Sequence, residues 1–376
     1  MAGIYIHIPY CKTRCAYCDF YTQTDQSVMK HYLDTLCREV KLRKDYLANE
    51  AVETIYFGGG TPSQLSVDQV KKILDVIKNC FCVAEDAEIT FEANPDDLNE
   101  EYLSSLRSAS INRLSIGVQS FDDEELAFLK RRHSAQQVAD VVRDAQLAGF
   151  GNISIDLMYG LPNQTLDAWK SNIVAAVGLG IQHISAYHLI YEEGTRLMDL
   201  LQKGKIETTK EELSVEMFSV LIDTLCEAKF EHYEISNFAK NGMLSRHNTS
   251  YWKGVKYLGL GAAAHSYNGV ERSWNVSSLA KYIEGIERGK PDLEVELLDL
   301  HTSYNEYILT RMRTKWGVDV GEIVVRFGTD LANHFRTDIN RHIKYGFVSC
   351  ENDVIRFTRK GIFISDGIMS ELMLLN

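Results

Sequence analysis

The chain has 376 residues, of which 45% are hydrophobic, 24% are charged and only 5 are proline. This composition excludes intrinsic disorder and collagen-like sequence, and the length allows two or three domains, or one barrel with an appendage. Lys and Arg number 40 against 52 Asp and Glu, and the resulting net charge of −12 disfavours binding to nucleic acid or anionic lipid.

No apolar run approaches the ~20 residues that a membrane-spanning helix needs, so we expect no transmembrane segment. A strand-like pattern begins at the first residues, without a signal or transit peptide before it. Eight cysteines in such a chain indicate reduced thiols. These features together predict a cytoplasmic protein.

Short β-branched or aromatic segments alternate with helix-like segments in the first half of the chain. The predicted strands cover residues 4–8, 54–57, 88–91, 113–118, 153–158 and 184–189, and the clearest predicted helices cover 29–47, 66–80, 135–147 and 166–177. Such alternation predicts a parallel α/β sheet, either doubly wound or closed toward a (β/α) barrel. In both arrangements, functional side chains gather at the carboxyl ends of the strands.

The pattern changes after about residue 200. A helix over 211–229 and a strand near Tyr233 precede a glycine-rich and aromatic stretch, residues 245–267, that we expect to form loops closing over the sheet. Helices over 303–312 and 330–345, a hairpin over 347–358 and a last helix predict a small winged-helix-like α+β domain. The predicted division is a barrel core at 1–200, an extension and lid at 201–290, and a C-terminal domain at 291–376.

Three cysteines, Cys11, Cys15 and Cys18, fall within eight residues directly after the first predicted strand. Three soft thiolates on one short loop are typical of a compact metal centre. A closed zinc site would need a fourth Cys or His, which is missing nearby, whereas three thiolates on a four-iron cluster leave one iron open to a small ligand. The other five cysteines are interpreted as packing residues.

Five motifs follow one another along the first half of the chain: YIHIP at 5–9, GGGTP at 58–62, EANP at 92–95, RLSIGVQSF at 113–121 and DLMYGLP at 156–162. With the cysteine loop, they make the sequence resemble the radical S-adenosylmethionine (SAM) proteins of the HemN/HemW group. The resemblance implies a partial (β/α)6 TIM-like barrel with a C-terminal winged-helix-like domain. It also implies a 4Fe-4S cluster held by Cys11, Cys15 and Cys18, with SAM bound to the open iron.

The residue chemistry agrees with a SAM site. The glycine-rich turn brings backbone groups close to a ligand, and three successive strands end near a polar side chain. The residues assigned to SAM or to the surroundings of the cluster are Tyr5, Tyr17, Gly59, Gly60, Thr61, Glu92, Gln119, Arg131 and Asp156. Arg131 corresponds by spacing to the family's arginine facing the SAM carboxylate, and Tyr5 and Tyr17 resemble its flanking aromatics. The alternatives are an ordinary strand-to-helix turn, solvated polar side chains at the barrel rim and core tyrosines.

The group has two branches, an oxygen-independent coproporphyrinogen III oxidase and a heme-binding chaperone. The oxidase pattern continues as Cys-x-Cys and has an N-terminal extension, whereas this sequence reads Cys18-Asp19-Phe20 and has three residues before its first strand. Both differences favour the chaperone. An oxidase that decarboxylates propionates by an adenosyl radical remains the alternative, and the acidic balance disfavours a winged-helix DNA regulator.

An HNxxYW motif at 247–252 is associated with heme in the chaperone branch. His247 could ligate heme iron, and Tyr251 and Trp252 could lie beside the porphyrin. The alternative is a hydrogen-bonded structural histidine in the predicted lid. The resemblance thus implies heme and heme-acceptor apoproteins as partners, an electron donor such as flavodoxin or ferredoxin if SAM is cleaved, and no nucleic acid.

Overall fold

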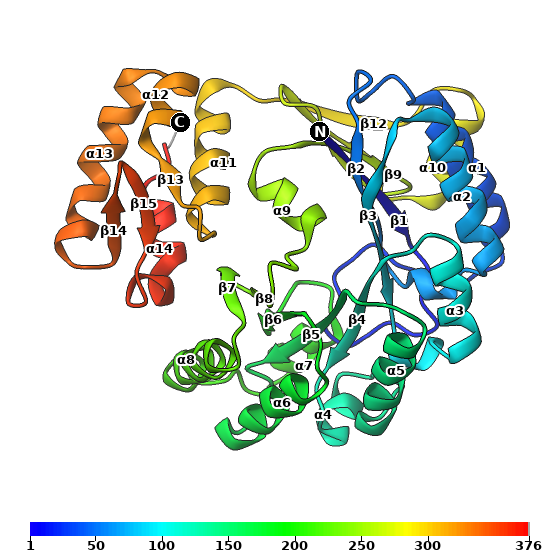
Figure 1. Ribbon diagram of the computed structural model, residues 1–376, viewed down its shortest axis with the longest axis horizontal. Coiled ribbons are helices and arrows are strands. Elements are labelled where there is room, and N and C mark those ends of the chain that lie inside the picture. The colour runs from blue at the N-terminus through cyan, green and yellow to red at the C-terminus, as the bar shows by residue number, and fades with distance from the viewer. Residues whose placement is uncertain (375–376) are drawn as a thin grey trace.

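The computed structural model describes residues 1–374, which form one large sheet, its covering helices and a smaller C-terminal domain (Figure 1). The strands of the large sheet are β1 Ala2–Ile8, β2 Val52–Gly59, β3 Val83–Ala93, β4 Arg113–Gln119, β5 Ile153–Tyr159, β6 His183–His188, β7 Glu231–Glu234, β8 Asn237–Ala239, β9 Lys256–Leu260, β10 His265–Tyr267, β11 Glu271–Asn275 and β12 Leu293–Leu297. Their order is β12-β11-β10-β9-β1-β2-β3-β4-β5-β6-β8-β7. Strands β1 to β6 pair in parallel with their sequence neighbours, so the predicted α/β unit of six strands is confirmed.

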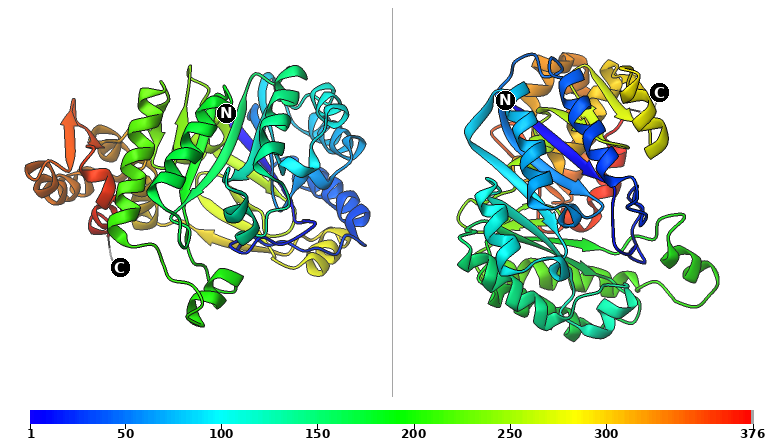
Figure 2. Two further views of the ribbon diagram at one scale, coloured as in Figure 1. Left: turned by 90° about the horizontal axis from the view of Figure 1, so that it is seen from below. Right: turned by 90° about the vertical axis from the view of Figure 1, so that its right-hand side faces the viewer.

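Helices cover the outer, convex face of this sheet, as Figures 1 and 2 show. The helices before the C-terminal domain are α1 Met29–Leu42, α2 Val67–Cys80, α3 Glu100–Ser108, α4 Asp123–Phe128, α5 Ala135–Leu147, α6 Leu166–Gly178, α7 Arg196–Gln202, α8 Glu211–Glu227, α9 Arg246–Trp252 and α10 Leu279–Glu287, with short 3-10 turns at Pro62–Gln64 and Pro95–Asp97. Helix α2 illustrates why they form. Ser66 and Gln69 make a reciprocal capping box at its start, and Ile73 and Ile77 lie on the face buried against the sheet.

Residues 245–267 differ from their predicted loop structure. They form helix α9 and strands β9 and β10, and β9 pairs in parallel with β1. Leu258 and Leu260 of β9 are fully buried, and their pairing with β1 covers a strand edge that would otherwise be open. The expected loops are therefore wrong for much of this stretch, because β9 and β10 extend the sheet and α9 is helical.

A buried ion pair fastens this extension to α1. The Glu39 carboxylate accepts hydrogen bonds from the Gly261 N–H at 2.8 Å, the Asn275 amide at 2.7 Å and the Tyr282 hydroxyl at 2.7 Å. Arg43, one turn later, donates to the Gly259 carbonyl at 3.0 Å. Because both charges are buried, removing either one leaves the other without compensation.

The C-terminal domain has its own hydrophobic core, built around Tyr304, Ile323 and Phe335. Its elements are α11 Leu300–Met312, β13 Val318–Asp319, α12 Val320–Phe327, α13 Thr329–Lys344, β14 Val348–Glu351, β15 Val354–Phe357, a 3-10 turn at Gly361–Ile364 and α14 Ser365–Glu371. The three strands form a separate antiparallel sheet in the order β13-β15-β14. The predicted domain boundaries stay predictions, and β12 pairs with β11 of the large sheet.

The two parts are joined by a buried carboxylate. Glu234 at the end of β7 is 2% exposed and accepts two hydrogen bonds from the Arg313 guanidinium, at 3.0 and 3.1 Å. A bridge between Glu234 and Thr314 continues the pairing. Within residues 1–374, every helix lacks the combination of length and apolar character required to span a membrane.

We expect Glu39→Ala to lower the free energy of unfolding by about 3–5 kcal/mol, because it leaves the Arg43 charge buried and unpaired. Urea denaturation of the full chain measures this. Glu284→Ala is the matched control, since Glu284 forms an exposed ion pair with Arg288 on α10 and should contribute about 1 kcal/mol or less. Equal losses in the two variants would contradict a structural role for the buried pair.

Candidate functional site

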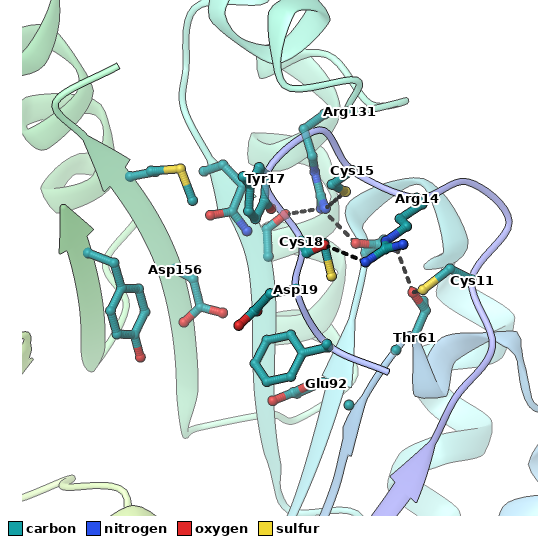
Figure 3. Close-up of a pocket in the computed structure, with 18 of the residues that line it drawn as sticks. Cys11, Arg14, Cys15, Tyr17, Cys18, Asp19, Thr61, Glu92, Arg131 and Asp156 are labelled. Carbon is teal, nitrogen blue, oxygen red and sulfur yellow. Dashed lines mark hydrogen bonds between the residues drawn. The ribbon is translucent and has the colours of Figure 1, made fainter. Parts of the chain in front are cut away.

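A pocket of about 460 Å³ opens at the carboxyl ends of β2 to β6, beside the loop that follows β1 (Figure 3). We call it the cysteine pocket. It brings together eleven residues that were predicted from separate motifs: Cys11, Cys15, Tyr17, Cys18, Gly59, Gly60, Thr61, Glu92, Gln119, Arg131 and Asp156. The parallel strand register explains their meeting, because it places the ends of successive strands at one rim.

The cysteine loop is held against the turn after β2 by backbone contacts. The N–H of Gly60 donates to the Ile8 carbonyl at 2.9 Å, and the N–H of Thr61 donates to the Tyr10 carbonyl at 2.8 Å. A Cβ at residue 60 would lie 2.7 Å from the Ile8 oxygen and 2.9 Å from the Tyr10 nitrogen and oxygen. Only glycine allows this approach, because all three obstacles are backbone atoms.

Two of the three thiols accept hydrogen bonds from the pocket walls. Thr61 Oγ1 donates to Cys11 Sγ at 3.2 Å, and Arg131 Nη1 donates to Cys15 Sγ at 3.3 Å. The Arg14 guanidinium donates to the Cys18 carbonyl at 3.0 Å. The Thr61 and Arg131 donors stabilise sulfur atoms that carry negative charge, as thiolates bound to a metal do.

The surroundings of Cys11 and Cys18 disfavour the ionised form of these two thiols. Burial raises the pKa of Cys11, against the opposing hydrogen bond from Thr61. Burial, together with the neighbouring Cys15 and Cys11, raises the pKa of Cys18 to about 11. Among the described residues, no three Cys, His, Asp or Glu side chains are placed to hold a single metal ion. The three thiols share one pocket.

Arg131 joins several walls of the cysteine pocket. Besides Cys15, its guanidinium donates to the Asn94 side-chain oxygen at 2.6 Å and to the Gly117 carbonyl of β4. Asn94 also donates to Thr61 Oγ1 at 3.3 Å. Asn94 was not singled out from the sequence, although it lies in the EANP motif two residues after Glu92, and this position at a strand end was the signal available.

Two carboxyl groups face the pocket from β3 and β5 (Figure 3). Burial raises the pKa of Glu92 to about 7, and the nearby Asp156 adds to this shift against a 2.6 Å hydrogen bond from Tyr56. Burial likewise raises the pKa of Asp156 to about 6. A bound cation would favour the charged forms of both groups and lower both pKa values.

Gln119 lies at an irregular point of β4. Its φ of 70° is left-handed, and the pairing with β5 shifts register between Gly117 and Gln119. A non-glycine residue in this region carries backbone strain, which concentrates at functional sites. The bulge turns Gln119 into the lining of the cysteine pocket.

The HNxxYW motif lies at the opposite, amino-terminal end of the strands, where α9 packs against β1 and β2. His247 is 1% exposed. Its Nδ1 is hydrogen-bonded to the Thr54 hydroxyl at 2.8 Å and its Nε2 to the Tyr251 hydroxyl at 2.7 Å. Because both ring nitrogens are hydrogen-bonded, the geometry of His247 is that of the alternative interpretation, a structural histidine. It differs from the geometry expected of an iron ligand, which needs one free ring nitrogen.

Three of the predicted residues line a second cavity, of about 660 Å³, between the large sheet and the C-terminal domain. We call this the tyrosine-rich pocket, after Tyr251, Tyr257, Tyr267 and Tyr307. Tyr5, which was assigned to the surroundings of cluster and SAM, lines this pocket and also lies near Gly58 and Glu92, so its assignment stays a prediction. Tyr251 and Trp252 line this pocket too. His247 lines neither pocket.

The burial of His247 predicts a pH-dependent stability. Burial, aided by the Arg113 charge, lowers the pKa of His247 to about 3, whereas an unfolded histidine titrates near ~6.5. Between these values the unfolded state binds more protons, so stability falls as the pH falls. His247→Asn should remove up to about 1.4 kcal/mol per pH unit of this dependence below about pH 6.

Urea unfolding of the metal-free chain from pH 7 to pH 5 measures the difference in slope. His334→Asn is the control, because the His334 side chain is 41% exposed on α13. If His247→Asn kept the wild-type slope, the histidine would be accessible and the buried position of α9 would be incorrect.

Comparison with known proteins identifies the family. Residues 5–174 match the radical SAM superfamily and residues 298–364 match the HemN C-terminal domain. The protein named heme chaperone HemW from Bacillus subtilis is 35% identical over 99% of this chain and 99% of its own length. The HemW of Lactococcus lactis is 32% identical over 98% of this chain and 97% of its own.

A solved structure of the coproporphyrinogen III oxidase HemN from Escherichia coli covers 99% of this chain and 90% of that chain, with a TM-score of 0.85. At 22% identity, this likeness establishes the fold alone. Full-length identity above 30% with the two bacterial HemW proteins establishes the closer relationship. The chain belongs to the HemW family of the radical SAM superfamily.

Proposed function

We propose that this protein is a heme chaperone, which binds a 4Fe-4S cluster and SAM in the cysteine pocket, binds heme, and transfers the heme to acceptor proteins. The observation that carries the cofactor assignment is that eleven residues predicted from separate sequence motifs line one pocket. A cytoplasmic location, expected from the cysteines, belongs to this proposal.

Cys11, Cys15 and Cys18 would hold the cluster. Three cysteines on one loop line the pocket, and Thr61 and Arg131 donate to two of their sulfur atoms. The raised thiol pKa values mean that the loop needs a positive centre to stay deprotonated, which iron provides. When bound, such a cluster supplies an open iron site for SAM and the electron that SAM cleavage requires.

The remaining pocket suits a zwitterion with an additional positive charge, as SAM has. Glu92 and Asp156 offer carboxylates to its ammonium or sulfonium group or to its ribose hydroxyls, and Arg131 offers a cation to its carboxylate. Gly59 and Gly60 keep the turn free of side chains where the ligand approaches. Cleavage of SAM would need an external electron donor, for which flavodoxin or ferredoxin is the chemical class.

The heme-carrier role rests on the full-length relatives, which bear the name heme chaperone HemW. Phe20 adds support. It stands where the oxidase pattern has a further cysteine, and it is 60% exposed beside the cysteine pocket. A coproporphyrinogen III oxidase activity is the competing outcome of the experiment below.

We expect Gly60→Ala to reduce the iron retained after anaerobic reconstitution to about half or less, because the added methyl group forces the cysteine loop away from β2 at a cost of about 1–3 kcal/mol. Iron and sulfide analysis per chain measures this. Gly178→Ala is the matched control, since a Cβ there meets no atom within 4 Å. Iron contents that are equal in the two variants would contradict the role of the close contact.

The function is tested by three measurements on one reconstituted sample. The protein should bind about one hemin per chain, pass it to an apo-acceptor such as an apocytochrome, and release no carbon dioxide from coproporphyrinogen III above the level of a Cys11, Cys15 and Cys18 triple-alanine control. Robust formation of protoporphyrinogen IX would replace the chaperone with the oxidase. Absence of hemin binding would contradict the proposal outright.

A further inference from the structure

The tyrosine-rich pocket is unexplained by the cluster and SAM. It lies between β1, β10 and β11 of the large sheet on one side and α11 and α12 of the C-terminal domain on the other, with the end of α9 at its floor. Its volume of about 660 Å³ exceeds that of the cysteine pocket. This size falls in the range of ~300–1,000 Å³ that is typical of ligand and cofactor sites.

Flat aromatic surface dominates this pocket. Tyr251 and Tyr257 meet edge to face with ring centroids 4.7 Å apart, and the Tyr267 ring lies 6.3 Å from Tyr257. Trp252 and Tyr307 complete the aromatic lining. The buried indole N–H of Trp252 has no hydrogen-bond acceptor among the described residues. Such a lining suits a large planar ligand with polar edges.

Cationic side chains outnumber carboxylates in this lining, although its arginines are already ion-paired: Arg272 with Glu296 and Glu306, and Arg311 and Arg326 with Glu322. Four cationic side chains, Lys253, Arg272, Arg311 and Arg326, face the pocket together with only two carboxylates, Asp19 and Glu306. The net charge of the protein is −12, so this concentration of arginine is local. The guanidinium group of arginine forms bidentate hydrogen bonds with carboxylates, which suits a ligand that carries carboxylate groups.

One histidine of this pocket is free to bind a metal. The His265 side chain is exposed on β10, and neither of its ring nitrogens has a hydrogen-bond partner among the described residues. Its ring stacks on Trp274 at a centroid distance of 5.5 Å and an angle of 24°, which fixes its orientation.

Other side chains around the pocket are less suited to iron. His7 is hydrogen-bonded through both ring nitrogens, to the Tyr21 carbonyl at 3.0 Å and the Tyr5 hydroxyl at 3.1 Å. Burial raises the pKa of Tyr257 to about 12 and also raises that of Tyr267. These phenols stay protonated at neutral pH, whereas ligation by tyrosine needs the phenolate.

We infer, on the basis of the proposed function, that heme binds in the tyrosine-rich pocket with His265 as a ligand of its iron and with its propionates directed toward Arg272, Arg311 and Arg326. His247 then acts as a positioning residue. Its hydrogen bond to Tyr251, at 2.7 Å, holds in place a tyrosine that lines the heme site. Asp19 and Phe20 line both pockets, so the heme would lie next to the cofactors across this short wall.

The test compares hemin with iron-free protoporphyrin IX in the full-length reconstituted protein. Loss of a metal ligand should exceed the loss of a supporting contact, so we expect His265→Ala to weaken hemin binding about tenfold or more and to shift the Soret band. Protoporphyrin IX binding should change less than about twofold, because it has no iron to ligate. His334→Ala, on exposed α13, is the control and should match the wild type for both ligands.

A second variant tests the pocket independently of the iron. Arg326→Gln should weaken hemin and protoporphyrin IX to the same extent, about threefold, as expected for a solvent-exposed ion pair. An unchanged Soret band and affinity in His265→Ala would overturn the ligand assignment, and unchanged affinity for both ligands in Arg326→Gln would overturn the pocket, with heme carriage still standing. A wild-type protein that binds no hemin would overturn the inference and the proposed function together.

Discussion

The close backbone contact between Gly60 and the segment Ile8–Tyr10 is the constraint on which the site depends. Without a side chain at residue 60, two backbone hydrogen bonds join the start of the cysteine loop to the turn after β2. Without these two hydrogen bonds, the cysteine loop would have to become ordered when the metal binds, and this ordering costs conformational entropy. The contact provides that order within the chain, before any metal arrives.

From this contact, polar interactions reach across the rim. Thr61 links the turn to Cys11, Asn94 links Thr61 to Arg131, and Arg131 reaches Cys15 and the β4 backbone. Farther out, the buried Asp97 carboxylate accepts hydrogen bonds from Lys12 of the cysteine loop at 2.6 Å and from Ser63 at 2.9 Å. Strands β2, β3 and β4 and the loop are therefore coupled through side chains whose partners are already in place.

The strands and motifs of the first half were predictable because their signals are local. Periodic apolar faces and capping residues define the helices, and each functional motif follows a buried strand, so the parallel register alone brings the motifs together. Eleven residues of the cysteine pocket could thus be assigned from the sequence and the family resemblance, whereas Asn94 was missed. The assignment of Tyr5 stays a prediction, because strand alternation indicates that its side chain points inward and leaves open which of the two adjoining pockets it serves.

Residues 245–267 resisted prediction for a physical reason. Strand β9 is a short KYLGL segment whose glycine is required because a Cβ at residue 259 would lie 2.0 Å from the His265 carbonyl oxygen. Glycine-rich sequence favours loops, and only the tertiary pairing with β1 makes it a strand. For the same reason His265 carried no signal, because its aromatic and cationic neighbours come from α9, β11 and a separate domain.

The central claim is that cofactors and heme occupy two adjoining but separate pockets, divided by Asp19 and Phe20. A hemin titration of the cluster-loaded protein at saturating SAM, followed by quantification of retained SAM, tests this most directly. The account predicts about one heme bound per chain with SAM and iron–sulfur content unchanged. Stoichiometric displacement of SAM by heme would place both ligands in one pocket and contradict the account.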